Sequence, residues 1–329
     1  MVQRLHRIMP FFQTDEQLQD QKHRILQATW EQFPQLAKNQ IAFSWVVYDP
    51  PIPVNTGGAL NPETFWNQPV RGVHYRGEER IYPASVVKIF YMVAVYEWLQ
   101  NGMIQSSPEL ERAVRDAIVD SSNDATGLMV DMLTGTTSGP ELPPGPFETW
   151  KQQRNLVNNY FQSFQWEEFE TININQKTWG DGPYGRERQF VGELMENRNM
   201  LTTNATTRLL HAIIGGVAVS SQASQEMMRL MRRSLNPADL DANPENQVRG
   251  FLGGGLTENI AGIKLWSKAG LTSSVRHDAA YIEIPGYRPY LLVVFTEGKK
   301  NSQSEEILPF VSQQFVEATK SLGEITTSH

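Results

Sequence analysis

The stretch Ile81-Tyr-Pro-Ala-Ser85-Val-Val-Lys88-Ile-Phe-Tyr-Met-Val-Ala-Val-Tyr96 contains a single formal charge, that of Lys88. A helix that begins after Pro83 would be apolar on nearly every face, which is typical of a helix buried in a protein interior. A lysine in such a helix loses its hydration shell, and this is costly unless the amine is paired or deprotonated. The sequence therefore predicts a buried lysine with a lowered pKa.

Ser85 lies three residues before Lys88, and residues three apart share one face of a helix. In the first turn of the helix, free backbone N–H groups and the positive end of the dipole favour a nearby oxyanion. A hydroxyl, an amine with a lowered pKa and an anion site together form an activated nucleophile. The alternative is a serine that caps the helix, followed by a lysine whose amine reaches water past its buried alkyl chain.

Composition narrows the class of protein. The chain has 329 residues, of which 40% are hydrophobic and 20% charged, as expected for a globular protein of one or two domains. The net charge of −7 argues against nucleic acid or an anionic membrane as a partner, since both require a basic patch. Because the chain has no cysteine, disulfides, catalytic thiols and Cys-ligated metals are excluded. A small-molecule substrate is the remaining expectation.

The N-terminus and the histidines carry further expectations. Residues 1–15 lack the apolar core and the cleavage site of a signal peptide, and no apolar stretch is long enough to span a bilayer. We therefore expect a cytoplasmic protein, or a periplasmic one if a leader was omitted. The six histidines show no metal-binding spacing. We expect a monomer with no metal and no cofactor.

Strand and helix patterns divide the chain into three parts. β-Branched and aromatic residues at 41–48 predict a buried strand, and further strands are predicted after residue 255. Helical periodicity dominates between them. This order predicts an α+β fold in which a sheet domain, residues 15–84 and 256–322, is interrupted by a helical domain, residues 85–255.

The expected elements have the following limits. Helices are expected at residues 16–33, 84–101, 109–120, 124–133, 148–165, 203–214, 223–235 and 305–322. Strands are expected at 41–48, 260–266, 279–284 and 290–295, with a hairpin formed by 73–76 and 80–82. Residues 179–199 are expected to form a long irregular loop, and Gly253-Gly-Gly255 a flexible joint.

Two short motifs follow Ser85 and Lys88 in the chain. Ser121-Ser-Asn123 lies between two expected helices, and Lys268-Ala-Gly270 lies near the end of an expected strand. Each has a simpler interpretation on its own, the first as a helix cap and the second as an exposed strand lysine beside a turn glycine. The order of the three motifs, each in a suitable structural context, favours a catalytic interpretation.

The three motifs resemble those of the class A β-lactamase and penicillin-binding protein superfamily of active-site serine hydrolases. Members carry Ser-x-x-Lys, Ser-x-Asn and Lys-Thr/Ser-Gly in this order. The flanks Gly77–Ser85, Asp120–Thr126 and Ser274–Ala280 are also similar, and the resemblance extends from about Asn39 to Leu322. It implies a β-lactamase/transpeptidase-like fold, with an antiparallel sheet flanked by helices and an inserted all-helical subdomain.

The resemblance also implies a role for each motif residue. Ser85 would be the nucleophile, and Lys88 would be a base or proton relay. Ser121 would pass a proton to the leaving nitrogen, Asn123 would bond the substrate amide, and Lys268 would bind the substrate carboxylate.

The end of the expected strand completes the implied site. The backbone N–H of Ser85 and a second N–H after Gly270, from Leu271 or Thr272, would form the oxyanion hole. Thr272, Ser273 and Arg276 could also reach the substrate carboxylate, and arginine would give the stronger charge-assisted bond.

The chain departs from the family pattern in three places. The interval from Ser85 to Ser121 is 121 − 85 = 36 positions, shorter than usual in class A enzymes. Ala269 replaces the hydroxyl residue of Lys-Thr/Ser-Gly. The Glu-x-x-Leu-Asn loop that supports deacylation in class A enzymes is absent as such, which leaves Glu187 or Glu193 as the base, or both as surface charges.

These features predict a β-lactamase-like serine hydrolase that forms an acyl-enzyme through Ser85 with β-lactams or related amides, with slow deacylation. Two alternatives stay open. One is a D-alanyl-D-alanine carboxypeptidase or esterase that acts on a peptidoglycan-type peptide. The other is a non-catalytic binding module with the same fold, which the departures favour.

Overall fold

The computed structural model describes residues 11–49, 61–256 and 262–325. Contacts divide the chain into two compact units. The sheet unit comprises the chain up to Glu79 and from Thr203 onward, and the helical unit comprises Arg80–Thr202.

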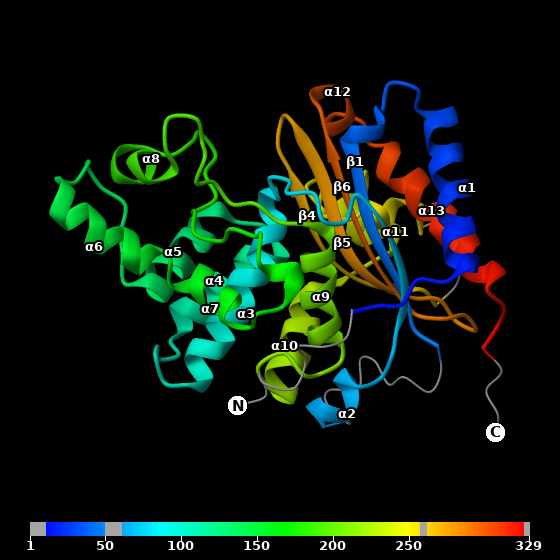
Figure 1. The fold of residues 1–329 in the computed structure, drawn as a ribbon, viewed down its shortest axis with the longest axis horizontal. Helices are drawn as coiled ribbons and strands as arrows, with labels where there is room; N and C mark the ends of the chain where they lie inside the picture. The colour runs from blue at the N-terminus through cyan, green and yellow to red at the C-terminus, as the bar shows by residue number, and fades with distance from the viewer. Residues whose placement is uncertain (1–10, 50–60, 257–261, 326–329) are drawn as a thin grey trace. The chain divides into compact units, whose positions relative to one another are not determined.

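The sheet unit is built on six antiparallel strands (Figure 1). Their order across the sheet is β2 (Arg71–Tyr75), β1 (Ile41–Val47), β6 (Tyr290–Glu297), β5 (Val275–Glu283), β4 (Lys264–Leu271) and β3 (Arg232–Arg233). Every neighbouring pair is antiparallel, so the predicted sheet type is confirmed.

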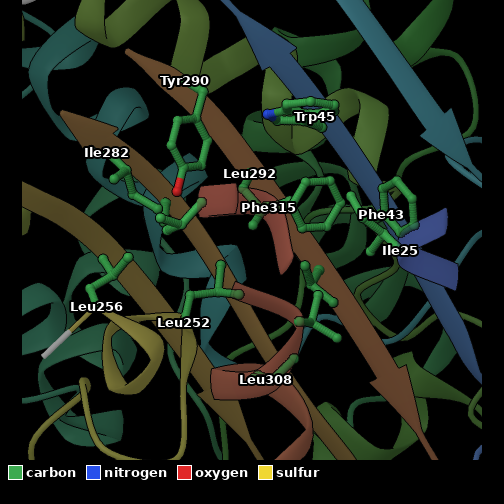
Figure 2. Packing of buried hydrophobic residues seen from close by; sticks show 14 of the residues in the cluster. Ile25, Phe43, Trp45, Leu252, Leu256, Ile282, Tyr290, Leu292, Leu308 and Phe315 are labelled. Carbon is green, nitrogen blue, oxygen red and sulfur yellow. The ribbon is translucent and has the colours of Figure 1, made fainter. Parts of the chain in front are cut away.

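Strand β1 explains why the predicted sheet needs helices on both faces. Its seven residues are all buried, although side chains of a strand alternate between the two faces. Phe43 and Trp45 project into one face, where their rings lie 5.1 and 5.2 Å from that of Phe315 (Figure 2). Ser44 projects into the other face, where its hydroxyl lies 2.7 Å from that of Thr203. A continuous apolar run is therefore the pattern of a strand covered on both sides.

Two helices cover each face of the sheet. Helices α1 (Glu16–Gln32) and α13 (Ile307–Ser321) share one core with the Phe43 face, as Figure 1 and the core residues show. Helices α9 (Thr203–Ile214) and α10 (Ser221–Met231) contact the other face. The shorter elements of this unit are η2 (Lys38–Gln40), α2 (Pro62–Trp66), α11 (Pro237–Ala242), η5 (Leu252–Gly255) and α12 (Lys299–Ser302).

The domain boundary predicted at residue 255 differs from the one that contacts define. Residues 203–255 were expected in the helical domain, but α9 packs on β1, β5 and β6, and α10 packs on β4. Helical periodicity identified these helices without indicating which core their apolar faces would join.

Gly253-Gly-Gly255 is a packed 3₁₀ turn rather than the flexible joint that the sequence predicted. A Cβ atom on Gly255 would lie 2.2 Å from the carbonyl oxygen of Pro309 in α13. Real Cβ atoms do not approach a backbone oxygen so closely, so glycine is needed here for close packing.

The helical unit surrounds α3 (Lys88–Gln100), whose residues from Lys88 to Val95 are all buried. Its contacts include α4 (Pro108–Val119), α5 (Asn123–Thr134) and α7 (Leu156–Ser163). The remaining elements are η3 (Ala84–Val87), α6 (Pro144–Arg154), η4 (Glu167–Phe169) and α8 (Gly185–Val191).

Four local predictions need correction. The expected hairpin between 73–76 and 80–82 does not form, because Ile81 pairs with Leu201. The helix expected at 148–165 is two helices, α6 and α7, separated at Asn155.

The loop expected at 179–199 contains α8. The strand expected at 260–266 is β4, which begins at Lys264, and residues 260–261 lie outside the described ranges. Across the described ranges, we find no helix with the length and hydrophobicity that a membrane span requires.

Candidate active site

Ser85 lies on the 3₁₀ turn η3, directly before α3. The backbone N–H of Lys88 donates to the carbonyl of Ser85, which closes the turn between the two residues. With three residues per turn, side chains three apart are eclipsed, so this turn stacks the Ser85 and Lys88 side chains more directly than an α-helix would. Ser85 itself is half-buried.

Ala84, immediately before Ser85, has φ +47°. This conformation is uncommon for a residue with a Cβ atom, and such residues are frequent at functional sites. Ser121 has a similar value, φ +59°. Positive φ therefore occurs at Ser121 and at the residue before Ser85, two positions that the motifs had singled out.

The amine of Lys88 joins the first and second motifs. Its side chain is 0% exposed. Nζ donates to the carbonyl of Ser121 at 2.5 Å and to Oδ1 of Asn123 at 3.0 Å, and it lies 3.3 Å from the Ser121 hydroxyl oxygen. The structure thus brings together three residues that the sequence predicted to act together.

The surroundings of Lys88 decide its protonation. Its hydrogen-bond partners in Ser121 and Asn123 are neutral groups. Burial removes water from the ammonium without a compensating negative charge, and this lowers the pKa of Lys88 to about 7. At neutral pH, a large fraction of the amine is therefore unprotonated and able to accept a proton.

Helix capping explains how Ser121 and Asn123 are placed. The Ser122 hydroxyl accepts the N–H of Ala125 at 3.1 Å and caps α5. Asn123 is the first residue of α5, and Ser121 is the residue before the cap. Ser122 therefore has the capping role considered for this motif, while Ser121 and Asn123 are directed toward Lys88.

Glu187 is buried in an ion-pair network. Arg154 donates to both of its carboxylate oxygens, at 2.7 and 2.8 Å, and the Ser138 hydroxyl donates to one of them at 2.8 Å. Asp131 and Lys177 extend the network through an ion pair of 2.7 Å. Glu187 is therefore a fully buried carboxylate paired with Arg154, not a surface charge. Its contacts indicate a structural role.

Glu193, the other candidate base, is exposed. Asn197, four residues later, bonds within the protein instead. Its Oδ1 accepts from Asn173 and Asn175, each at 3.0 Å, and its Nδ2 donates to the carbonyl of Phe190 at 3.2 Å. These bonds hold the segment after α8 and do not leave Asn197 as a water ligand beside Glu193.

Lys268 lies within β4 of the sheet unit and is also 0% exposed. Its Nζ donates to Oε1 of Gln247 at 2.5 Å and to the carbonyl of Ala269 at 2.8 Å. The interpretation of Lys268 as an exposed strand lysine is thus wrong.

Two other charged groups share this buried region. Arg233 donates twice to the carbonyl of Ser267, at 2.8 and 3.1 Å. Asp278 accepts the N–H of Leu252 at 3.0 Å and is fully buried. Burial raises the pKa of Asp278 to about 7. The hydrogen bond from Leu252 and the positive charges of Arg233 and Lys268 oppose this rise.

The hydrogen bonds along the edge of β4 that faces away from β5 distinguish the two candidates for the second oxyanion donor, Leu271 and Thr272. In an antiparallel strand, alternate residues point their N–H and C=O to the same side. Ser267 and Ala269 use theirs to bond Arg233 and Gln247, away from β5. The same alternation directs the N–H of Leu271 to this edge. The N–H of Thr272 instead donates to the carbonyl of Val275 at 2.9 Å, which closes the turn.

Gly270 is buried between Ala269 and Leu271 on β4, and Thr272 is half-buried just beyond the strand. The Thr272 hydroxyl lies 3.3 Å from that of Ser274 within the same turn.

Arg276 does not present a guanidinium available for a substrate. Its Nε donates to the carbonyl of Ser302 at 2.8 Å and Nη1 to that of Gly250 at 3.0 Å. It pairs with Leu271 across the strands, whereas Lys268 pairs with Ala279, so the two cations leave opposite faces of the sheet. These bonds favour a structural role for Arg276, and its role in binding the substrate carboxylate stays a prediction.

Sequence reasoning overlooked the partners of the motif residues. Gln247, Arg233 and Arg154 are buried polar residues outside the three motifs and their flanks, and Asp278 lies in the flank Ser274–Ala280 without having been assigned a role. Their positions depend on contacts between distant segments. Only the apolar surroundings of Asp278 in its strand, with Ala279 and Ala280 following, offered a local indication of burial.

A family model described as the beta-lactamase enzyme family matches residues 105–319, more than half of the chain. The chain belongs to the beta-lactamase enzyme family. The match begins after Ser85 and Lys88 and includes the second and third motifs, Ser121-Ser-Asn123 and Lys268-Ala-Gly270. The predicted superfamily is confirmed. No curated protein sequence matches the chain.

Solved structures support the fold assigned by family membership. A PBP-A mutant, in an acyl-enzyme complex with penicillin G, is 16% identical, with 95% of this chain and 100% of that chain covered and a TM-score of 0.62. The beta-lactamase of Sphaerobacter thermophilus is 18% identical over 91% and 98% of the two chains, with a TM-score of 0.58. The beta-lactamase of Chitinophaga pinensis is 13% identical over 91% and 99%, with a TM-score of 0.59.

Proposed function

We propose that this chain is a serine hydrolase in which Ser85 is acylated by β-lactams or by related D-alanyl amides. The observation that carries the proposal is the state of Lys88, a buried amine with a pKa of about 7 that bonds Ser121 and Asn123. A binding module would have no need of an amine poised to accept a proton at neutral pH.

The proposed acylation uses neutral Lys88 as the base. Its amine accepts the proton of the Ser85 hydroxyl while Oγ attacks the carbonyl carbon of the substrate. The developing oxyanion is stabilised by the N–H groups of Ser85 and Leu271. When the carbon–nitrogen bond breaks, Ser121 passes a proton to the leaving nitrogen and is reprotonated by Lys88, 3.3 Å away.

The remaining polar groups recognise the substrate. We propose that Asn123 bonds the substrate amide, because its Oδ1 is already fixed by Lys88 and its side chain lies on the first residue of α5. We propose that Lys268 binds the carboxylate, with Gly270 and Thr272 forming the adjoining rim. A buried ammonium attracts a carboxylate more strongly than an exposed one, because water does not screen the interaction.

The bonds of Glu187 favour slow deacylation. General-base assistance is worth roughly 10²–10⁴-fold in rate, and a carboxylate needs an oxygen available to take a proton from water. Both oxygens of Glu187 accept from Arg154. We propose that the acyl-enzyme persists, as in a penicillin-binding protein. The acyl-enzyme described for the similar PBP-A structure is consistent with this proposal.

Intact-protein mass spectrometry tests the proposal. Benzylpenicillin should add its full mass once to the wild-type chain, and the adduct should be absent in Ser85→Ala. Ser163→Ala, an exposed serine in α7, is the matched control and should be labelled like the wild type. If neither β-lactams nor activated esters label the wild type, the non-catalytic alternative is correct.

Turnover of a chromogenic cephalosporin separates a β-lactamase from a penicillin-binding protein. We expect one rapid equivalent of product followed by slow turnover. Fast turnover that is lost in Glu187→Gln or Glu193→Gln would instead identify that glutamate as the deacylating base.

A further inference from the structure

The side chain of Gln247 connects Lys268, which the proposed function requires, to the backbone of β4. Its Oε1 accepts from Nζ of Lys268 at 2.5 Å and from the backbone N–H of Ala269 at 3.2 Å. Gln247 is only 8% exposed and lies between α11 and η5, 21 residues before Lys268 in the chain. A single amide oxygen thus bonds both the ammonium and the strand that carries it.

This arrangement fixes the direction of the ammonium. An amide oxygen has two lone pairs, and here one accepts from the ammonium and the other from the strand. A second donor of Lys268 is directed to the carbonyl of Ala269. Because Ala269 has no hydroxyl, no side chain at that position assists Lys268, and Gln247 supplies the nearby polar oxygen.

The neutrality of the Gln247 side chain matters as much as its position. The positive charges of Lys268 and Arg233 both act on buried Asp278. A neutral amide bonds the ammonium without neutralising it, whereas a carboxylate in the same place would form an ion pair with it. Gln247 therefore holds Lys268 in place without adding a negative charge beside the ammonium.

We propose that Gln247 is a positioning residue that makes Lys268 selective for substrates that carry a carboxylate. The inference rests on the proposed function and deepens it, since it names the residue that sets the preference for an anionic substrate. Gln247 touches Lys268 and β4 and takes no part in the chemistry at Ser85.

The experiment compares two probes that differ only in charge, benzylpenicillin and its methyl ester. Acylation rate constants are measured by intact-protein mass spectrometry for the wild type, Gln247→Glu, Gln247→Met and Lys268→Met. The quantity of interest is the rate constant for benzylpenicillin divided by that for its methyl ester. A variant that is partly unfolded reacts more slowly with both probes, so this ratio does not change. Gln303→Glu adds the same charge at an exposed position and serves as the matched control.

We expect Gln247→Glu to lower this ratio about tenfold to a hundredfold, the value of one charge-assisted hydrogen bond. Lys268→Met should lower it at least as far, Gln247→Met should lower it less, and Gln303→Glu should leave it unchanged. The Michaelis constant for the anionic probe should rise, while the maximal acylation rate with the ester should stay the same.

Other outcomes would count against the inference in distinguishable ways. If the wild type reacts with both probes and the ratio is the same in Gln247→Glu, the positioning role is refuted and the proposed function stands. If Gln247→Met slows both probes equally, Gln247 is a general structural residue. If neither probe labels the wild type, the proposed function fails and this inference fails with it.

Discussion

The rate at which Ser85 is acylated should follow the titration of Lys88. Burial lowers the pKa of this amine to about 7, and only the unprotonated form can accept the Ser85 proton. For a pKa of about 7, the unprotonated fraction is about 1% at pH 5, about half at pH 7 and nearly complete at pH 9. The acylation rate should therefore rise about a hundredfold from pH 5 to pH 9, with its midpoint near pH 7.

Rapid-quench mass spectrometry with benzylpenicillin, at intervals of half a pH unit, would measure this profile. Lys88→Arg is the informative variant, because a guanidinium stays protonated throughout this range. It should lose the pH dependence and acylate roughly 10²–10⁴-fold more slowly at pH 9, the usual contribution of a general base.

The titration of Asp278 must be distinguished from that of Lys88, because burial raises the pKa of Asp278 to about 7 as well. In Asp278→Asn the midpoint should stay where Lys88 places it. A profile that is flat from pH 5 to pH 9, or that rises only near the pKa of a solvated lysine, would refute Lys88 as the base. A midpoint that disappears in Asp278→Asn would transfer the titration to that residue.

Three further predictions concern stability, each measured by urea or thermal denaturation. Glu187→Gln should destabilise the fold by about 3–5 kcal/mol, because it leaves the buried Arg154 guanidinium without its full negative partner. The control Glu193→Gln, at an exposed position, should change stability by less than about 0.5 kcal/mol. Equal effects of the two substitutions would refute the structural role of Glu187. Gly255→Ala should lower the free energy of unfolding by about 1–3 kcal/mol, because the new methyl group would meet a backbone oxygen. The control Gly145→Ala in α6 has open space around it and should be neutral or slightly stabilising. A Gly255→Ala variant as stable as the wild type would contradict the close packing. Burial holds the pKa of His211 well below its usual value, so the unfolded chain binds its proton first and the contribution of His211 to stability should fall below about pH 6.5, by up to about 1.4 kcal/mol per pH unit. The raised pKa of Asp278 contributes the opposite slope below about pH 7, so the quantity to measure is the stability of the wild type minus that of His211→Gln, and a difference that does not change with pH would contradict the prediction.

Local patterns predicted most of the elements. The helix expected at 203–214 is α9 with the same limits, because its periodicity extends over three turns without interruption. Errors arose where one residue redirects the chain. The expected hairpin fails after Arg76, whose φ of +51° turns the chain, and Ile81 finds its partner at Leu201. Such long-range pairing leaves no local signal in the sequence.

The candidate site was predictable as far as its motifs and no further. Burial of Lys88 followed from its apolar neighbours, and the pKa near 7 is the physical consequence. The environments of Glu187 and Arg276 did not follow, because Arg154 and the carbonyls of Gly250 and Ser302 reach them from distant segments. A charged residue near a motif has the same appearance in the sequence whether it contacts a substrate or the backbone.

The outer edge of β4 also has a consequence for solubility. An exposed strand edge is a template on which a second chain can add a strand, the first step of edge-to-edge aggregation. Here β3 pairs with Leu265 and Trp266, and the side chains of Arg233 and Gln247 occupy the next two outward positions. Among the residues that the structure describes, only the outward groups of Leu271 follow them on the strand. One residue is too short to nucleate a strand, so this edge offers little template for edge-to-edge pairing.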